Sequence, residues 1–541
     1  MSLRNIDSNI YNQALNYLES VLNRHGKSLK EFPNMPIPTA LTNYEQDNYL
    51  IQEEQSYNFE ELIQTFENGF YQLNVDQKAI FEKVILAVET QTPDIIFVDG
   101  PGGTGKTFLY NILLAKICLN GYIALAVASS GIASLLLPGG RTAHSRFKIP
   151  FNLHEDSTCS ISHGSELASL LQITSLIIWD EAPMMNRYAF EALDRTLRDI
   201  MKALNPNLEG KPFGGKVVLF GGDFQQILPV VVKGRREDIV GLCLCRSTLW
   251  KHVNVMKLKI NMRLFNATNN SDTAEQAEFA KWLLEVGEGR VPAISKTESD
   301  TIILPEDIVL SSQDLNDLIN FVYHDLSTYS DPKYFVECGI LAPTNEYVNS
   351  INTIIMNQFP GEAVEYLSAD TVEEADDQCP QEFLNSLTVS SLPPHKLILK
   401  LGTPIILLRN LQPNDGLCNG TRLVCRTFQK HVIEAEIITG NHPGTRVFIP
   451  RIMMSPSDTD LPFIFKRRQF PVQPAFAMTI NKSQGQTLNW VGLYLPTPVF
   501  SHGQFYVACS RVTSRKNLKI LITKRHGKNV TCNVVYPEIF Q

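Results

Sequence analysis

The stretch IIFVDGPGGTGKT, residues 95–107, joins a continuous apolar run to a glycine-rich turn, and the helical pattern YNILLAKICL follows directly. A strand, a G-x-x-x-x-G-K-[S/T] turn and a helix in this order are typical of a phosphate-binding loop. Glycine N–H groups close around phosphate oxygens, and the helix N-terminus favours an anion. The stretch therefore predicts a nucleotide site formed by Gly100, Gly102, Gly103, Thr104, Gly105, Lys106 and Thr107.

The same domain carries a second set of chemically active residues. We expect the Lys106 ammonium between the β- and γ-phosphates of ATP, and the Thr107 hydroxyl on Mg²⁺. Further along, the buried strand SLIIW (175–179) ends in Asp180 and Glu181. Two adjacent carboxylates at the end of such a strand are costly unless a cation meets them. Asp180 is therefore expected to hold Mg²⁺ through water, and Glu181 to orient or deprotonate the attacking water.

Short apolar runs alternate with helical patterns along most of the chain. IIFVDG, YIALAVAS, SLIIWDE and KVVLFGGD predict a doubly wound α/β domain with a buried parallel sheet. A weaker series of the same kind begins near residue 253 and includes CGILAP, FAMTIN, VGLYLP and LKILIT. Residues 399–470 are instead rich in turns and β-branched residues, which favours a small all-β insertion. Residues 1–70 are expected to form a helical lead-in.

Composition excludes several other classes of protein. Apolar residues make up 44% and charged residues 19% of 541 residues, which indicates a globular protein with a sizeable core. The net charge of −8 argues against indiscriminate coating of nucleic acid, although a local basic groove is compatible with it. No signal peptide, transit peptide or membrane span is predicted. The 10 cysteines contain no C-x-x-C pair, which favours reduced thiols in an intracellular protein over a metal site.

Further motifs follow one another in a fixed order. They are Leu73-Asn-Val-Asp-Gln77, Ala128-Ser-Ser-Gly131-Ile-Ala133, Gly140-Arg-Thr-Ala-His144-Ser-Arg-Phe147, Gly222-Asp-Phe-Gln-Gln226, Asn481-Lys482-Ser483-Gln484-Gly485-Gln486-Thr487 and Tyr506-Val-Ala-Cys-Ser-Arg511. Together with the phosphate loop, this set resembles helicases of the Pif (petite integration frequency) family, superfamily 1B, over about residues 70–525. One departure is Leu228, where the family usually has proline.

The resemblance implies a P-loop ATPase with two RecA-like domains. The first would span residues 71–252, with a small wedge-like insertion at about 141–170. The second would span 253–398 plus 471–541, and the all-β insertion at 399–470 would be SH3-like. Its basic end, Lys466-Arg467-Arg468, would help to clamp a DNA strand, with a solvated basic loop as the alternative.

The resemblance also implies roles in the nucleotide site. Gln77 would hydrogen-bond the adenine edge, Gln226 would sense the γ-phosphate, and Gly485 would contact the nucleotide. Arg511 and Arg263 would reach across from the second domain and stabilise transition-state charge. From the residues alone, Gln77 is more often a polar residue at a helix start, and either arginine is more often a surface ion-pair partner.

Contacts to DNA are expected from both domains. Small hydroxyls, backbone N–H groups and an occasional lysine suit a strand that must slide, because phosphate contacts carry no sequence information. The candidates are Ser129, Ser130, Gly131, Thr142 and His144 of the first domain, and Thr344, Lys482, Ser483 and Gln484 of the second. Phe147, with His144, would offer a stacking surface; packing of these rings in the core is the alternative.

The function implied is that of an ATP-dependent DNA helicase that moves 5′ to 3′ on single-stranded DNA and unwinds duplex, in repair, recombination or telomere maintenance. LPPHKLILKLG, LLRNL and GLCNGTRL (392–402, 407–411 and 416–423) resemble the helicase portion of helitron transposons. A helicase part of such a transposon, or a decayed relic of one, is therefore an alternative. A further alternative is a nucleotide-dependent binding switch or an RNA remodeller that does not unwind. We expect single-stranded DNA and DNA junctions as partners, a monomer, and a place in the nucleus.

Overall fold

The computed structural model describes residues 48–262 and, with short gaps, 270–540. The gaps are 296–297, 325, 327–331, 374–378, 390, 413–414, 441, 457–460, 462 and 524–528, and before residue 48 only 15, 19, 28–32 and 35–37 are described. The predicted role of Arg263 thus lies outside the described residues. Within the described part, no helix is both long and apolar enough to cross a bilayer.

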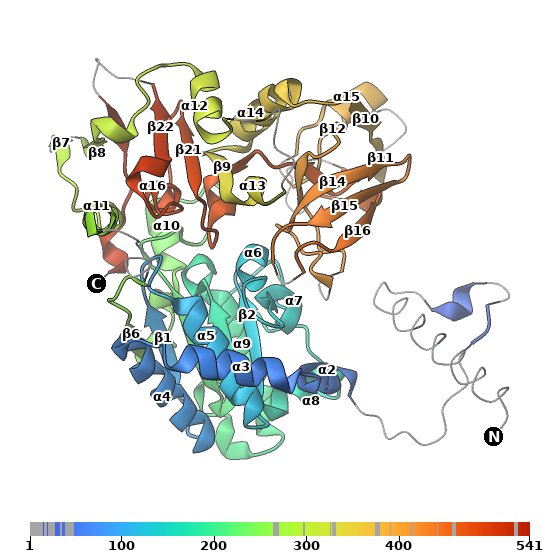
Figure 1. The fold of residues 1–541 in the computed structure, drawn as a ribbon. Coiled ribbons are helices and arrows are strands. Elements are labelled where there is room, and N and C mark those ends of the chain that lie inside the picture. Colours follow the sequence, from blue (N-terminus) through green and yellow to red (C-terminus); the bar gives the residue numbers. More distant parts are fainter. Residues whose placement is uncertain are drawn as a thin grey trace. The chain divides into compact units, whose positions relative to one another are not determined.

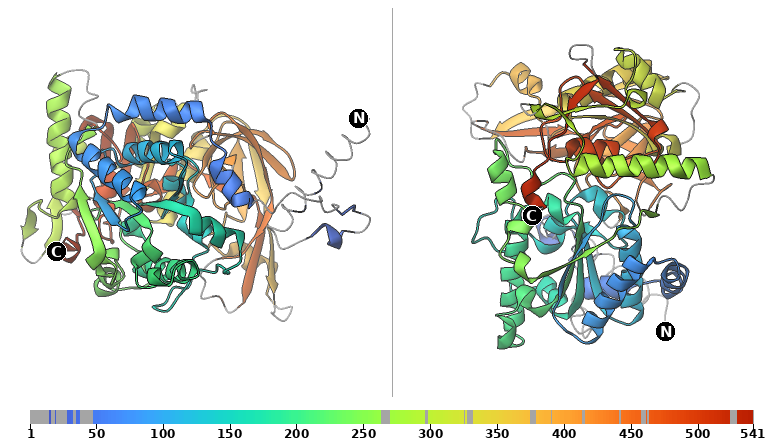
Figure 2. Two further views of the ribbon diagram at one scale, coloured as in Figure 1. Left: turned by 90° about the horizontal axis from the view of Figure 1, so that it is seen from below. Right: turned by 90° about the vertical axis from the view of Figure 1, so that its left-hand side faces the viewer.

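The chain divides into two compact units, Met1–Glu53 and Glu54–Gln541. In the smaller unit, a 3₁₀ helix, η1 (Leu29–Glu31), begins at Ser28, whose side chain and backbone complete a capping box with Glu31. The larger unit contains both α/β domains. Their arrangement is drawn in Figure 1 and from two further sides in Figure 2.

The first domain is built on a six-stranded sheet of order β3-β2-β4-β5-β1-β6, in which all strands run parallel. The predicted apolar runs form its buried strands, and their carboxyl ends meet at one edge of the sheet. This edge faces the second domain (Figure 1). The strands are β1 (Ile95–Asp99), β2 (Ile123–Ala128), β3 (Arg141–Thr142), β4 (Thr174–Asp180), β5 (Val217–Gly222) and β6 (Val253–Lys257).

Helices cover both faces of this sheet. The helices of the first domain are α3 (Phe59–Phe70), α4 (Val75–Glu89), α5 (Lys106–Leu119), α6 (Gly131–Ser134), α7 (Ala143–Phe147), α8 (Glu166–Ile173), α9 (Arg187–Lys202) and α10 (Arg236–Gly241), and α2 (Tyr49–Gln55) contains residues of both units. Short 3₁₀ helices are η2 (Ala182–Met184), η3 (Pro206–Leu208), η4 (Pro212–Gly215), η5 (Leu244–Arg246) and η6 (Trp250–His252).

Three elements of the structure lie across the boundaries predicted for the first domain. Helix α3 belongs to the domain, not to a separate lead-in ending at residue 70, because its Phe66 and Phe70 pack on Phe81 of α4. Strand β6 completes the first sheet beside β1, although residue 253 was placed in the second domain. The proposed insertion at 141–170 begins inside the sheet, since β3 pairs with β2. Each boundary depends on a long-range contact that local periodicity does not reveal.

The second domain has a four-stranded parallel sheet of order β20-β9-β21-β22. An antiparallel sheet, β23-β8-β7, lies at its end. The strands are β7 (Ala293–Ser295), β8 (Glu298–Ile303), β9 (Cys338–Ala342), β20 (Ala477–Thr479), β21 (Trp490–Leu495), β22 (Leu518–Ile522) and β23 (Val530–Cys532). The helices are α11 (Asn270–Gly287), α12 (Leu315–Val322), α13 (Pro332–Glu337), α14 (Asn345–Gln358), α16 (Gln504–Cys509), η8 (Glu306–Ile308), η10 (Ile480–Ser483), η11 (Arg515–Asn517) and η12 (Pro537–Ile539).

The β-rich region lies between β9 and β20 and consists of three antiparallel sheets, β10-β12, β11-β18-β17 and β16-β15-β14-β13-β19. Its elements are β10 (Ala363–Leu367), β11 (Ala369–Glu373), α15 (Gln381–Ser386), β12 (Lys396–Lys400), β13 (Pro404–Leu407), β14 (Arg422–Phe428), β15 (Val432–Ile437), β16 (Arg446–Pro450), β17 (Ile452–Met454), β18 (Ile464–Gln469) and β19 (Val472–Pro474). The region is therefore wider than the predicted 399–470, because strands on both sides of that segment pair into its sheets. The α/β fold with two parallel-sheet domains and an antiparallel β region is confirmed.

Candidate ATP hydrolysis site and DNA-binding surfaces

Hydrogen bonds to backbone carbonyls hold the phosphate loop in a tight turn. Gly105, with a φ of 79°, begins α5, and the Gly100 N–H donates to the Gly222 carbonyl at the end of β5. The Lys106 ammonium donates to the Gly100 carbonyl and so lies across the mouth of the loop. A positive φ favours glycine because it has no Cβ. The loop therefore presents its N–H groups and one ammonium to the space in which phosphates would lie.

Gln77 lies behind this loop instead of lining the cavity in front of it. Its Nε2 donates to the Thr104 carbonyl at 3.1 Å and to the Gly105 carbonyl at 3.4 Å. Its Oε1 accepts from the Asn74 N–H at 3.0 Å, which completes the capping box of α4. The side chain is fully buried. Gln77 thus positions the phosphate loop, and the adenine contact stays a prediction.

Asp180 and Glu181 are both buried where β4 ends, as the sequence predicts. Glu181 adopts a φ of 52°, and its N–H donates to Asp180 Oδ1 at 2.9 Å. Burial raises the pKa of both carboxyls, and repulsion from Asp180 raises that of Glu181 further. The positive charge of Lys106 opposes this shift for both groups. Strained backbone at such a site is a common feature of catalytic residues.

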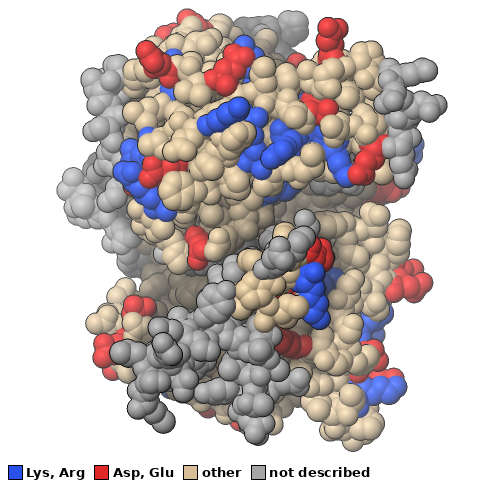
Figure 3. Space-filling model, turned by 90° about the vertical axis from the view of Figure 1, so that its right-hand side faces the viewer, with Lys and Arg blue, Asp and Glu red and all other residues tan. Residues whose placement is uncertain are grey.

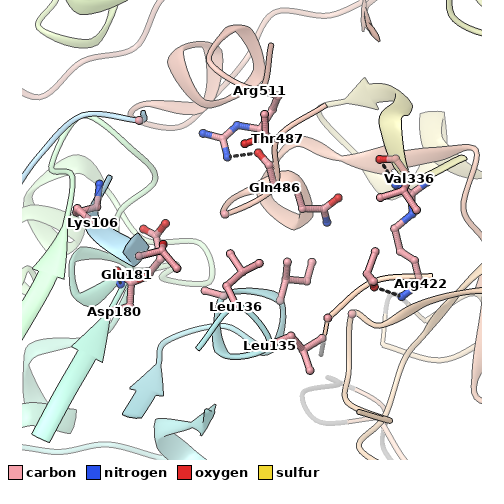
Figure 4. Close-up of a pocket in the computed structure, with 18 of the residues that line it drawn as sticks. Lys106, Leu135, Leu136, Asp180, Glu181, Val336, Arg422, Gln486, Thr487 and Arg511 are labelled. Atoms are coloured by element: carbon pink, nitrogen blue, oxygen red, sulfur yellow. Dashed lines mark hydrogen bonds between the residues drawn. The ribbon is translucent and has the colours of Figure 1, made fainter. Parts of the chain in front are cut away.

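One cavity of about 630 Å³ joins these groups to the second domain. Lys106, Asp180, Glu181 and Gln226 line it from the first domain, and Gly485 and Arg511 from the second. Figure 4 shows Arg511 on the side opposite Asp180 and Glu181. Its Nη1 donates to the carbonyls of Ser483 (3.2 Å) and Gln486 (3.0 Å), and its Nε to that of Val507 (2.9 Å). The guanidinium is thus fixed beside the nucleotide site.

The residues of this cavity suit Mg²⁺ bound together with a nucleotide. Thr107 and Asp180 both line the cavity and carry oxygen atoms, which are the ligand type that Mg²⁺ prefers. Burial also raises the pKa of Asp223, so three buried carboxyls lie near one ammonium, Lys106. A divalent cation would offset the excess of negative over positive charge among these groups. No cluster of three His, Cys, Asp or Glu ligands is found among the described residues. A Mg²⁺ ion held here would complete its coordination with phosphate oxygens and water.

The segment Gly222–Gln226 connects the nucleotide site to the second domain. Asp223 Oδ2 accepts from the Tyr506 hydroxyl at 3.0 Å and from Gln226 Nε2 at 3.3 Å. His502 donates to the Phe224 carbonyl. A Cβ on Gly503 would lie 2.3 Å from the carbonyl oxygen of Gln225, so the two backbones touch. Sequence reasoning assigned Gln226 in this segment but missed Asp223, His502 and Tyr506, although GDFQQ and the motif that contains Tyr506 were recognised.

A second contact between the domains involves the segment after β23. The Arg236 guanidinium of α10 forms a bidentate pair with the Glu538 carboxylate, at 2.7 and 3.1 Å. Arg246 Nη2 donates to the Glu538 backbone carbonyl at 2.8 Å. Arg236 also lies over the Tyr536 ring. The segment that contains η12 is therefore attached to the first domain.

The predicted DNA contacts of the first domain lie on α6 and α7, next to the β-rich region (Figure 1). Ser130 and Thr142 cap these helices, and Ser129 Oγ accepts from Trp179. A Cβ on Gly131 would lie 2.2 Å from the Asn419 carbonyl oxygen of the β-rich region. Phe147 is fully buried against Trp179, which is the core packing that the sequence left open as an alternative. It offers no stacking surface.

The predicted DNA contacts of the second domain divide into two groups. Thr344 begins α14, and its buried Oγ1 has no hydrogen-bond partner among the described residues. Burial lowers the pKa of Lys482, and no described carboxylate pairs with it. Ser483 and Gln484 are instead buried, with Ser483 bonded to the Ile480 carbonyl and Gln484 Nε2 donating to Glu181 at 3.3 Å. Gln484 therefore lies at the candidate hydrolysis site, where its amide donates to the Glu181 carboxylate.

The basic end of the β-rich region is not a uniform basic loop. Arg467 is buried and forms a bidentate pair with Asp370 at 2.8 and 2.9 Å, whereas Arg468 is exposed. Lys466 pairs with Glu373. Figure 3 shows further Lys and Arg side chains gathered on the outer face of this half, with acidic groups among them. Arg467 holds the sheet together and is unavailable to DNA.

Known proteins resemble this chain over most of its length. It is 26% identical to the ATP-dependent DNA helicase Pif1 of Campylobacter jejuni, over 80% of this chain and 90% of that protein. It is 28% identical to human ATP-dependent DNA helicase PIF1 over 83% of this chain, but spans only 61% of the human protein. Bacteroides Pif1 bound to single-stranded DNA shares the fold, with a TM-score of 0.59, 22% identity, and coverage of 85% and 99%. Pif1 helicase from Candida albicans gives a TM-score of 0.57, 22% identity, and coverage of 86% and 98%.

Fold and site together define a P-loop ATPase of the helicase class, with two parallel-sheet domains around one nucleotide cavity. The family model of PIF1-like helicases matches residues 72–297, and that of the DNA helicase Pif1 2B domain matches residues 382–428. The chain belongs to the Pif1-like helicases, a family of ATP-dependent DNA helicases.

Proposed function

We propose that this chain hydrolyses ATP with Mg²⁺, moves 5′ to 3′ along single-stranded DNA and unwinds duplex ahead of it. The observation that carries the proposal is the single cavity in which Lys106 and Glu181 of one domain face Arg511 of the other. ATP bound there would contact both domains, and its hydrolysis would release one from the other. The direction of movement rests on the family resemblance.

Each side chain has a distinct task in this mechanism. Lys106 neutralises the β- and γ-phosphates, Glu181 orients the attacking water, and Arg511 stabilises the charge that develops on the transferred group. Gln226 reports the γ-phosphate to the Gly222–Gln226 segment. When bound by Thr107 and Asp180, Mg²⁺ supplies charge stabilisation between the phosphates. Gln484 keeps the Glu181 carboxylate in place through its hydrogen bond.

The DNA strand is proposed to cross α6, α7 and the start of α14. Support comes from Thr344 Oγ1, which lacks a partner among the described atoms at a helix N-terminus, where an anion is favoured. Lys482 adds a partly buried ammonium without a carboxylate partner in the described part of the chain. Ser129, Ser130, Gly131, Thr142 and His144 complete the proposed contacts. Phe147, Ser483 and Gln484 are left out because they are buried.

Relatives support DNA as the track. One structure of a relative concerns unwinding at forked double-stranded DNA by two coordinating Pif1 helicases, and another relative is bound to single-stranded DNA. We therefore propose single strands and junctions as the partners of this chain. A monomer suffices for the cavity, since both halves come from one chain.

The finer placement within the family rests on sequence alone. LPPHKLILKLG, LLRNL and GLCNGTRL support a helitron-like subgroup of superfamily 1B. We propose a nuclear role in DNA repair, recombination or telomere maintenance, with a transposon helicase as the second candidate because of these three segments. Every proposed catalytic side chain within the described residues is present, which disfavours a decayed relic.

The deciding experiment is steady-state ATP hydrolysis with and without single-stranded DNA, beside Glu181→Gln. The variant preserves shape but removes the base, so turnover should fall by about 10²–10⁴-fold while ATP still binds. Forked substrates with a 5′ or a 3′ tail then test polarity. Hydrolysis that is indifferent to DNA would contradict the motor, and unwinding only from a 3′ tail would contradict the direction.

A further inference from the structure

A second cavity, of about 520 Å³, lies on the first domain outside the hydrolysis site. It is a groove between the segment that follows α7 and two loops that leave the catalytic motifs. Every residue that lines it is described. The lining includes His144, Phe151, Asn152, Met185, Asn186 and Val230.

Phe151 is the unusual residue of this groove, because its side chain is 89% exposed. Its ring lies almost parallel to that of His144, with centroids 5.7 Å apart and planes at 15°. Burial lowers the pKa of His144, so the imidazole is an uncharged flat ring. The ring of Phe151 therefore lies beside that of His144 and stays largely exposed in the groove. An exposed aromatic ring in a groove offers a surface on which a base of a single strand can stack.

Polar side chains line the groove together with the exposed ring of Phe151. The side chains of His144 and Asn152 have no hydrogen-bond partner among the described residues, so their donors and acceptors are free for a ligand. Asn186, whose Oδ1 caps α9, also lines the groove. Val230 adds apolar surface, being 76% exposed. A flat ligand with an aromatic face and a polar edge suits such a lining, and a nucleobase has both.

Two segments that line the groove follow directly from residues of the candidate hydrolysis site. Met185 and Asn186 follow Glu181 through the 3₁₀ helix η2, and Val230 follows Gln226 after a short loop. A ligand in the groove would thus touch the segments that leave the catalytic carboxylate and the γ-phosphate sensor. His144 is also at the start of α7, among the proposed strand contacts.

We propose that this groove is a nucleobase subsite, in which one base of single-stranded DNA leaves the stack and lies on the exposed ring of Phe151. The inference rests on the proposed function and deepens it. The occupied subsite would hold the loops after Glu181 and Gln226 in place, so that the presence of a base and ATP hydrolysis are linked.

The test replaces single nucleotides by abasic ones along the tail of a forked DNA, whose junction sets the register. Binding to the full chain is measured by fluorescence anisotropy with a non-hydrolysable ATP analogue. Base–aromatic stacking predicts about tenfold weaker binding when one particular position is abasic. Phe151→Ala should weaken binding to intact DNA by about the same factor and abolish the sensitivity at that position. Phe151→Trp should restore it.

Tyr71→Ala is the matched control, because Tyr71 is also an exposed aromatic of this domain, at 87%, and lies outside the groove. It should leave the abasic profile unchanged. The subsite is refuted if Phe151→Ala shows the same abasic profile as the wild type while its melting temperature is unchanged. Failure of the wild type to bind single-stranded DNA at all would instead refute the proposed function.

Discussion

His502 of the second domain donates a hydrogen bond from Nε2 to the carbonyl oxygen of Phe224 in the first, at 2.9 Å. The backbone N–H of Tyr536 donates to the other ring nitrogen, Nδ1, at 2.9 Å. Because Nδ1 accepts, the ring is neutral and its proton is on Nε2. The side chain is fully buried, and burial lowers its pKa to about 4. One imidazole therefore joins three segments of the chain.

This pKa predicts that stability falls in acid. Above the ordinary histidine pKa of about 6.5, the ring is neutral in both folded and unfolded chain, and the contact is fully present. Between about 6.5 and 4 only the unfolded chain binds the proton, so the free energy of unfolding falls, by about 3 kcal/mol in total. Urea denaturation of wild type and His502→Gln across this range measures the difference.

His431→Gln is the control for this titration, because His431 is exposed. It should follow the wild-type pH dependence, whereas His502→Gln should show a shallower one. Equal slopes for all three proteins would contradict a neutral, buried His502.

Tyr506→Phe is expected to weaken the connection between nucleotide site and second domain. It removes the hydroxyl that donates to Asp223 and leaves a buried carboxylate with one donor fewer. A hydrogen bond to a charged group contributes roughly 1.5–3 kcal/mol, so DNA-stimulated kcat should fall by at least about tenfold, with little change in KM for ATP.

Tyr323→Phe provides the comparison for Tyr506→Phe. The Tyr323 hydroxyl is equally buried and donates to the Phe476 carbonyl at 2.5 Å, within the second domain alone. Its loss should lower thermal stability but not kcat. If both variants reduce kcat alike, the effect is one of general destabilisation.

Gly503→Ala should disrupt the backbone contact between the domains. Its Cβ would lie 2.3 Å from the Gln225 carbonyl oxygen, and its φ is +68°. Gly139 has a φ of +63° but open space around it. Gly139→Ala therefore has the same strain without the clash and should lose about 1–2 kcal/mol of stability. Only Gly503→Ala should also lose DNA-stimulated hydrolysis; equal activities would show that the contact is dispensable.

Arg511→Lys should abolish most turnover although the charge is kept. The planar guanidinium reaches three carbonyls, which an ammonium cannot reproduce. Loss of an arginine finger lowers kcat by about 10³–10⁵-fold, with ATP binding retained. Arg515→Ala, which removes a surface pair with Asp307, is the neighbouring control. Retained activity in Arg511→Lys would assign Arg511 a structural role only.

The sequence predicts those parts of the site that lie within one strand–loop–helix unit. The phosphate loop, Asp180 and Glu181 follow from local pattern, because a strand end and the next helix start fix their positions. The fold class follows for the same reason, since buried parallel strands are continuous apolar runs. Contacts between segments far apart in the chain cannot be predicted from local pattern in this way.

Gln484 is an example of a residue whose contact could not be predicted from the sequence. Its motif suggested a DNA contact, yet the junction of two domains turns its amide to Glu181, more than 300 positions away in the chain. Phe147 and Arg467 are similar cases, since an aromatic or a basic residue in a motif gives no sign of the core or the carboxylate that receives it. Strands β10 to β12 were missed because antiparallel pairing over long loops leaves no local period.

Arg236 and Glu538 attach the two α/β domains to each other at a point besides the contact between His502 and Phe224. A body fixed to another at one point can turn in any direction, but fixed at two points it turns only about the line through both. The second domain would then rotate about a single axis and would not turn freely in all directions. ATP bound in the cavity would need to change only the rotation angle about this axis. Each cycle would then return the surfaces proposed to contact DNA to the same relative position.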